Sequence, residues 1–104
     1  MGDRAMAEIK VSDGSLFFYT HWTGENLVQQ CEEALTKARP RIGDDAYATK
    51  IALDSLIETS GARDSETGAG VMLKPHAGDE YNGDEPSVIL DLVDGTVEKR
   101  GMRR

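Results

Sequence analysis

A histidine and a tryptophan stand side by side at His21 and Trp22, directly before a stretch with helical periodicity. An imidazole and an indole at the start of a helix could hold a phosphate and a base, because unpaired N–H groups and the helix dipole attract anions there. Arg4 opens the preceding β-rich run and could join them. The alternative is structural: Trp22 belongs to the core, His21 shields the sheet and Arg4 is solvated.

A second polar group surrounds the predicted start of the next helix. It consists of Asp44, Asp45, Tyr47 and Lys50. Helix capping explains one of the two aspartates, and a tyrosine at such a position is more often a packing residue than a ligand contact. Asp45 and Tyr47 are therefore candidate ligand residues with a structural alternative.

The remaining reactive side chains do not form a known catalytic or metal-binding pattern. Cys31 lies on the apolar stripe of a predicted helix, which favours a buried thiol over a nucleophile. Two isolated histidines and one cysteine give no zinc pattern, and the acidic stretch GDEYNGDEP lacks the spacing of an EF-hand loop. The sequence thus predicts no metal and no cofactor, and it favours binding over catalysis.

Composition restricts the class of protein. The 104 residues predict one domain over residues 1–98, with a flexible basic tail at 99–104 that leaves the domain with a net charge of −11. Such an acidic domain disfavours direct nucleic-acid binding. The sequence has no apolar run of about 18 residues and no apolar stretch near its start, so it predicts neither a membrane span nor export. One cysteine fits a reducing cytoplasm.

The pattern of apolar residues predicts the elements. Two β-rich runs, at 5–11 and 16–22, flank Asp13-Gly14 and predict a hairpin. Helical periodicity predicts a helix over 25–39 that ends at Pro40. Asn26 or Thr23 could cap it, and Asn26-x-x-Gln29 has the pattern of a capping box. A second helix begins at Asp44 or Asp45 and stops at Gly61. Its predicted apolar face is Tyr47, Ile51, Leu53, Leu56 and Ile57.

Short strands at 71–74, 87–93 and 96–98 complete the order ββααββ(β). Hairpins that flank two helices favour an α+β fold, because a parallel α/β sheet needs strands that alternate with helices. We therefore expect an antiparallel sheet of four to five strands with both helices packed on one face.

The hairpin turn decides which side chains share a face of this sheet. A two-residue Asp13-Gly14 turn places Ile9 opposite Phe18, so the alternate residues of both strands face away from the helices. The second hairpin would place Asp91 opposite Glu98. An apolar helix-free face on a small domain predicts an isologous homodimer. The predicted interface residues, with Val71 and Leu73 of the third strand turned toward the core, are Met6, Phe17, Tyr19, Met72, Ile89 and Val93.

The motifs MGDRA at 1–5 and YTHWTG at 19–24, followed by DDAY and ETGAG, resemble a family of small proteins encoded by bacteriophages and bacterial genomes. Its members open with Met-Gly-Asp/Asn-Arg-Ala before a Tyr-x-His-Trp-x-Gly signature. The resemblance covers most of the chain and implies a mobile-element context. It makes Arg4, His21, Trp22 and Gly24 the preferred site candidates.

These observations predict a small non-enzymatic binding protein of the cytoplasm. If phage-encoded, it could inhibit a host defence by sequestering a nucleotide-like signal or by blocking a host protein. Two alternatives stay open: a hydrolase or nucleotide-processing enzyme that uses His21, and an acidic DNA mimic. The predicted ligand residues are Arg4, Tyr19, His21, Trp22, Gly24, Asp45 and Tyr47.

Overall fold

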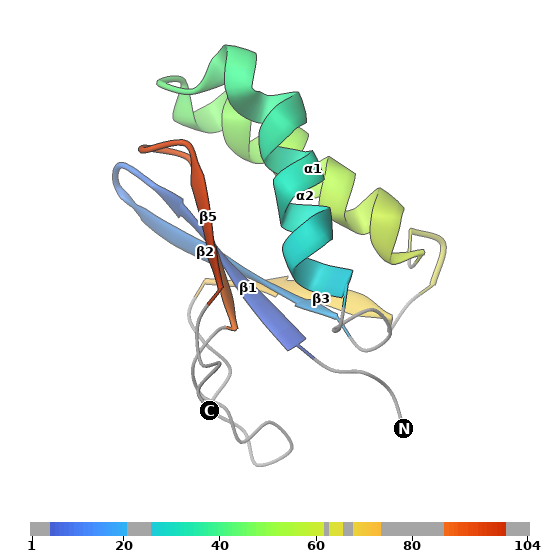
Figure 1. Cartoon of the computed structure of the whole chain (residues 1–104). Helices are drawn as coiled ribbons and strands as arrows, with labels where there is room; N and C mark the ends of the chain where they lie inside the picture. Colours follow the sequence, from blue (N-terminus) through green and yellow to red (C-terminus); the bar gives the residue numbers. More distant parts are fainter. Residues whose placement is uncertain (1–4, 21–25, 62, 66–67, 74–86, 100–104) are drawn as a thin grey trace.

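A five-stranded sheet carries two helices on one face (Figure 1). The computed structural model describes residues 5–20, 26–61, 63–65, 68–73 and 87–99. The elements are β1 Ala5–Val11, β2 Gly14–Thr20, α1 Leu27–Ala38, the 3-10 turn η2 Arg39–Arg41, α2 Asp45–Ser60, β3 Ala69–Met72, β4 Val88–Asp91 and β5 Thr96–Lys99. The prediction of an α+β fold with both helices on one face is confirmed.

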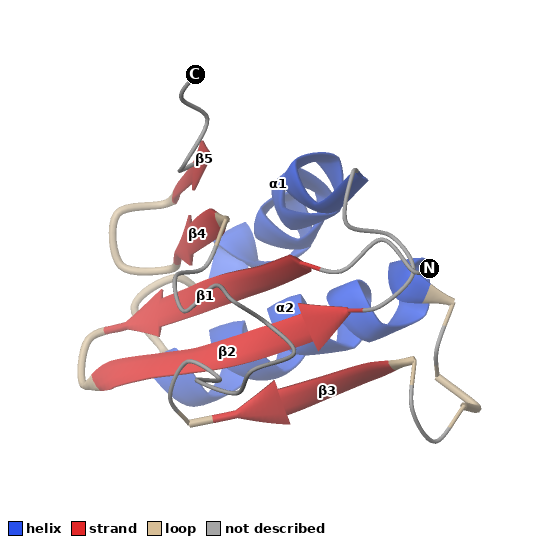
Figure 2. Ribbon diagram, turned by 90° about the horizontal axis from the view of Figure 1, so that it is seen from below, coloured by secondary structure: helices blue, strands red, loops and turns tan. Residues whose placement is uncertain are grey.

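The sheet is mixed, with strand order β3-β2-β1-β4-β5 (Figure 2). The central strand β1 runs antiparallel to β2 and parallel to β4, so Ile9 pairs with Leu16 on one side and with Leu90 on the other. The prediction of a purely antiparallel sheet is therefore wrong at the β1–β4 pair. Hairpin signals describe strands that are neighbours in sequence, and β1 and β4 are far apart in the chain.

The first hairpin turns one residue earlier than predicted. Ser12 and Asp13 form the turn, and Val11 pairs with Gly14. Gly14 has φ +154°, a conformation that L side chains rarely adopt, so the glycine is needed at the start of β2 rather than within the turn. The cross-strand pairing consequently differs from the predicted one by two residues, since Ile9 pairs with Leu16 instead of Phe18. A shift of two leaves every side chain on its predicted face, and Phe18 lies in the core beneath the helices.

The core lies between the sheet and the helices. It combines alternate residues of β1, β2 and β4 with one stripe of each helix. Leu27, Cys31, Ala34, Leu35 and Ala38 form the α1 stripe, as its periodicity predicts.

The buried face of α2 differs from the predicted one. Tyr47 is 56% exposed, and Ile51, Leu53 and Ile57 are only partly buried. The buried residues are instead small apart from Leu56: Ala48, Ala52, Ser55, Leu56 and Ser60. The α2 helix therefore turns its small side chains inward, where it contacts α1 and the sheet, and its larger apolar side chains lie at the edge of this buried face.

The helix ends confirm some of the predicted signals. Asp44 caps α2, since its carboxylate accepts a hydrogen bond from the Tyr47 backbone N–H at 3.4 Å. Gly61 ends that helix with φ +77°, and Pro40 lies in η2, directly after α1. The predicted capping box is wrong, because the Asn26 side chain makes no capping hydrogen bond.

Two residues predicted to be exposed on the helix-free face are buried. Met6 is 1% exposed and Phe17 is 7% exposed. Cross-strand neighbours shield part of this surface from solvent, since Phe17 pairs with Glu8 of β1 on one side and with Met72 of β3 on the other. The helix-free face therefore exposes little apolar surface at Met6 and Phe17.

The predicted burial of the third strand is also wrong. Val71 is partly exposed and Leu73 is 79% exposed. Because β3 is an edge strand, the helix α2 packs mainly over β1 and β2 and leaves this side of β3 less covered.

Asp91 organises the turn between β4 and β5. Its carboxylate accepts hydrogen bonds from the backbone N–H groups of Val93 and Asp94, at 2.9 and 2.8 Å. The other carboxylate oxygen lies 3.8 Å from Nζ of Lys10. The predicted pair of Asp91 with Glu98 is wrong, because Asp91 stands opposite Thr96. The like-charge contact that the sequence predicts is thus avoided.

Candidate functional site

The predicted ligand residues do not form one site in the described part of the chain. Arg4, His21, Trp22 and Gly24 lie outside the described residues. Tyr19 lies near the end of β2, five residues and about 17 Å along the strand from Gly14.

Asp45 lies at the opposite end of that hairpin. Its carboxylate accepts a hydrogen bond from the Ser12 hydroxyl group, which fixes the start of α2 beside the β1–β2 turn. Asp45 also places a negative charge in the first turn of α2, where the helix dipole favours it. The Arg41 guanidinium group lies over the Tyr47 ring, 5.7 Å from the ring centroid, which is within the range of a cation–π contact. Both side chains thus have local structural partners.

A groove between α1 and α2 is the strongest candidate site among the described residues. It has a volume of about 230 Å³ and is lined by Lys37 of α1 and by Lys50, Ile51, Asp54, Ser55 and Glu58 of α2. We call this the interhelical groove. The spacing of the α2 residues places them along one side of the helix. The side-chain amide of Gln30 donates to the Thr59 carbonyl at 3.2 Å, which joins the start of α1 to the end of α2 and makes the helices antiparallel.

The Ser55 hydroxyl group sets this groove apart. Ser55 is 2% exposed, and its Oγ is the one buried side-chain polar atom of the described residues that has no hydrogen-bond partner. The neighbouring hydroxyls are bonded: Thr59 donates to the Ser55 carbonyl and Ser60 donates to the Ile57 carbonyl, at 2.9 and 2.8 Å. Leaving a buried polar group unpaired costs about 1–3 kcal/mol. Buried polar groups in proteins usually have a partner, and the described residues supply none for this hydroxyl group.

Two ammonium groups belong to the groove lining. The Lys37 ammonium lies 3.7 Å from the Glu33 carboxylate, in an ion pair whose two side chains are about half exposed. Lys50 makes no ion pair or side-chain hydrogen bond with the described residues. Both cations are therefore available to a bound molecule.

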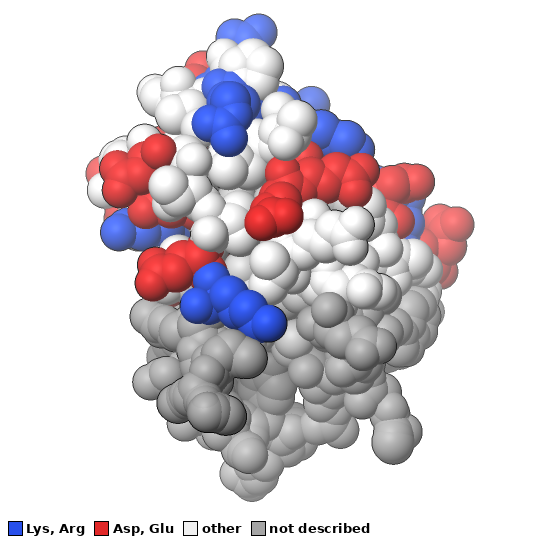
Figure 3. All heavy atoms as spheres, in the orientation of Figure 1, with Lys and Arg blue, Asp and Glu red and all other residues white. Residues whose placement is uncertain are grey.

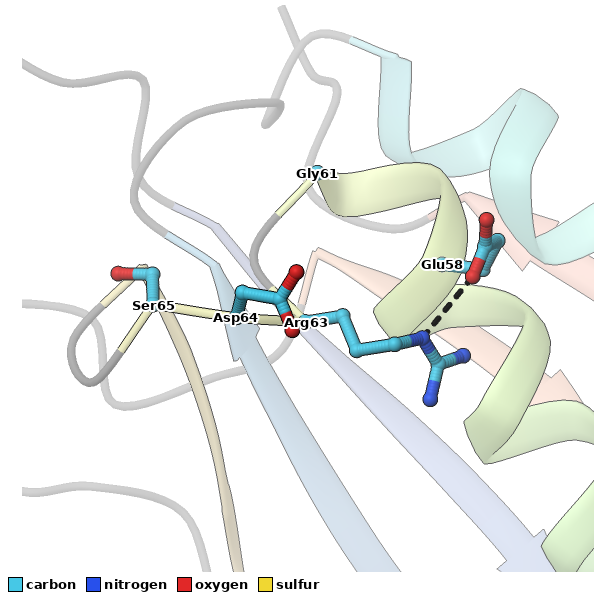
Figure 4. Close-up of a pocket in the computed structure, with 5 residues that line it drawn as sticks. All are labelled: Glu58, Gly61, Arg63, Asp64 and Ser65. Atoms are coloured by element: carbon cyan, nitrogen blue, oxygen red, sulfur yellow. Dashed lines mark hydrogen bonds and ion pairs between the residues drawn. The ribbon is translucent and has the colours of Figure 1, made fainter.

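Arg63 pairs with two carboxylates of the groove lining, Asp54 and Glu58, and Figure 4 shows its contact with Glu58. Its guanidinium group donates to Asp54 at 2.8 Å and to Glu58 at 2.9 Å. These hydrogen bonds raise the pKa of Arg63. A second hollow of about 420 Å³ lies beyond this contact and shares Glu58 with the groove. Arg63 and Glu58 in its lining already bond to each other, whereas the groove contains the unpaired Ser55 hydroxyl group. The groove is therefore the stronger candidate site.

The Cys31 thiol is not activated for nucleophilic chemistry. Burial, with a smaller effect of Glu32, raises the pKa of the Cys31 thiol to about 12, so this group stays protonated at neutral pH. No cluster of three or more His, Cys, Asp or Glu residues that could hold a metal ion occurs within the described ranges. Neither α1 nor α2 has the length and apolar character that a membrane-spanning helix requires.

Comparison with protein-family models, with curated proteins and with solved structures finds no match. The groove residues Lys37, Asp54, Ser55 and Glu58 were not among the sequence candidates. The spacing Ala48, Ala52, Ser55 is a signal that could have placed a hydroxyl on the contact face of α2. Lys37 and Lys50 come together only through the packing of two helices, which periodicity within one helix does not predict.

Proposed function

We propose that this chain is a non-enzymatic binding protein that sequesters a small ligand in the interhelical groove. The observation that supports this proposal is the buried Ser55 hydroxyl group without a partner. A ligand atom that hydrogen-bonds to Oγ would offset the cost of burying it. The groove, of about 230 Å³, is slightly smaller than most small-molecule sites, which measure about 300–1,000 Å³, so the ligand must be compact. A nucleotide-like signal is the ligand that we propose.

The two alternative functions have less support. An enzyme would depend on His21, which lies outside the described residues, while the buried Cys31 thiol is a poor nucleophile. A DNA mimic needs acidic groups gathered on one surface. In Figure 3, acidic and basic side chains are interspersed over the described part of the face shown. A separate acidic surface therefore has no support on that face.

The biological setting that we propose rests on the resemblance in sequence. The protein would be encoded by a phage, act in the host cytoplasm and inhibit a host defence. Blocking of a host protein is the alternative to sequestering a signal. We also propose a homodimer through the helix-free face, now limited to Tyr19, Met72, Ile89 and Val93 because Met6 and Phe17 are buried.

Replacing the hydroxyl group tests the proposed site. Ser55→Ala should leave the free energy of unfolding unchanged or raise it, because it removes an unpaired buried polar group. The same variant should lose ligand that copurifies with the wild-type chain, detected by absorbance near 260 nm and by mass spectrometry. Ser60→Ala is the matched control, since Ser60 is buried on the same helix but is not part of the groove lining.

The Ser60→Ala variant should retain the ligand and lose about 0.5–1.5 kcal/mol of stability, because its hydroxyl makes a hydrogen bond to the Ile57 carbonyl. Equal ligand content in the two variants and the wild-type chain would contradict the proposed site. A loss of stability in Ser55→Ala larger than in Ser60→Ala would mean that the hydroxyl has a structural role.

A further inference from the structure

We propose that the interhelical groove recognises a phosphate group, held between the ammonium groups of Lys37 and Lys50. This inference rests on the proposed function and specifies its ligand class. The two lysines come from different helices and line the same groove. Two lysines that line one groove from different helices offer two cations to different oxygens of one phosphate, as a single exposed lysine does not.

The competing contact of Lys37 is weak. Its pair with Glu33 spans one helical turn at 3.7 Å, and both side chains are about half exposed. Exposed pairs of this kind contribute less to stability than a charge-assisted hydrogen bond to a phosphate contributes to binding. Lys50 has no competing pair among the described residues. A phosphate can therefore recruit both ammonium groups at little cost.

The two carboxylates of the groove direct the phosphate to the lysine end. Asp54 and Glu58 would repel an anion, but Arg63 bonds to both and offsets part of their charge. The more distant acidic residues have little influence, since charges beyond about 8 Å are screened at physiological salt. The carboxylate end suits hydrogen-bond donors of the ligand, such as amino groups.

The length of the groove limits the size of the ligand. Lys50 and Glu58 are eight residues apart on α2, a distance of about 12 Å along the helix. Ile51 adds an apolar side chain to the lining between them. These features fit one compact phosphate monoester with an amino-bearing body, such as a nucleoside monophosphate, rather than an oligonucleotide.

Calorimetric titration of the full chain with adenosine monophosphate, inorganic phosphate and adenosine tests this inference. We expect adenosine monophosphate to bind most tightly, inorganic phosphate to bind more weakly and adenosine to bind weakest. Lys37→Gln and Lys50→Gln should each lower the affinity for adenosine monophosphate about tenfold. Lys99→Gln removes one exposed charge from β5, outside the groove, and should leave the affinity unchanged.

The possible outcomes separate this inference from the proposed function. Equal affinities for adenosine and adenosine monophosphate, with no effect of either lysine variant, would overturn the phosphate inference. If Ser55→Ala still abolished that binding, the groove would remain a ligand site for an uncharged molecule. If none of the three probes bound and Ser55→Ala did not change copurification, the inference and the proposed function would both fall.

Discussion

Two buried polar side chains of this protein differ in how their surroundings satisfy them. Asp91 is held by two backbone N–H groups of its own turn and by the Lys10 ammonium group. Ser55 is also buried but has no hydrogen-bond partner for its hydroxyl within the described part of the chain. The contacts of the first residue account for its burial, whereas those of the second leave its hydroxyl group unpaired.

Replacement of Asp91 should reveal how much the turn depends on its carboxylate. Asp91→Ala leaves the Val93 and Asp94 N–H groups without their acceptor, and we expect it to lower the free energy of unfolding by about 1–3 kcal/mol. Asp91→Asn retains an acceptor oxygen and should cost less, because the ion pair with a half-exposed Lys10 contributes little. Urea denaturation measures both variants. An equal loss in the two would mean that the charge, not the hydrogen bonds, stabilises the turn.

The Cys31 thiol should make stability depend on pH in alkaline solution. Burial raises its pKa from 9.0 to about 12, so the unfolded chain releases this proton at a lower pH than the folded chain. The stability contributed by the thiol is therefore fully present below pH 9 and is lost as the pH rises toward 12.

The variant Cys31→Ala lacks this titration and isolates its effect from that of other groups. The difference in unfolding free energy between the wild-type chain and the variant should shrink from pH 9 to pH 11. Chemical denaturation at several pH values measures that difference. A constant difference over the range would show that the thiol ionises alike in both states.

At the scale of elements, the packing of α1 against α2 creates the interhelical groove. Several buried residues of the two helices are small: Ala34 and Ala38 on α1 and Ala48 and Ala52 on α2. The longer side chains of Lys37 and Lys50 line the groove between the helices.

A larger side chain at this contact should disturb both stability and the groove. Ala52→Leu adds volume to a fully buried position, and we expect it to cost about 1–3 kcal/mol of unfolding free energy. Ala46→Leu makes the same chemical change at an exposed position of α2 and should be almost neutral. Thermal and urea denaturation of the pair test this. Equal stability of both variants would contradict close packing of the helices at Ala52.

Several elements could be predicted from the sequence because their signals are local. The α1 stripe, the Asp44 cap and the Gly61 stop depend on residues within one helix. The faces of the first hairpin were also predicted, because side chains alternate with a period of two even when the register moves. The parallel pairing of β1 with β4 and the buried face of α2 depend on contacts between distant segments. The groove depends on the same contacts, so neither Ser55 nor Lys37 was predicted.

At the scale of the whole molecule, the exposed apolar side chains lie at separate places. Among the described residues, the exposed large hydrophobic side chains are Tyr47, Val71, Leu73 and Val93. Val71 and Leu73 lie at the edge formed by β3, whereas Val93 lies in the turn that follows β4. Only Val93 of these four belongs to the proposed dimer interface. Burying it against a second copy would favour association.

Substitution of these valines should distinguish the proposed dimer face from the β3 edge. Val93→Asp should weaken a homodimer formed through the helix-free face without unfolding the chain, because the side chain is exposed. Val71→Asp is the control on β3 and should leave the association unchanged. Light scattering at micromolar concentration measures both. A monomeric mass for the wild-type chain would contradict the dimer.

The claim that the interhelical groove is the ligand site is tested most directly by nuclear magnetic resonance of the isotope-labelled full chain during titration with adenosine monophosphate. We predict that the largest shifts occur at the amides of Lys37, Lys50, Ile51 and Ser55, and that Ser55→Ala abolishes them. Shifts that centre on Tyr19 and the residues after it, with the groove amides unchanged, would contradict the account.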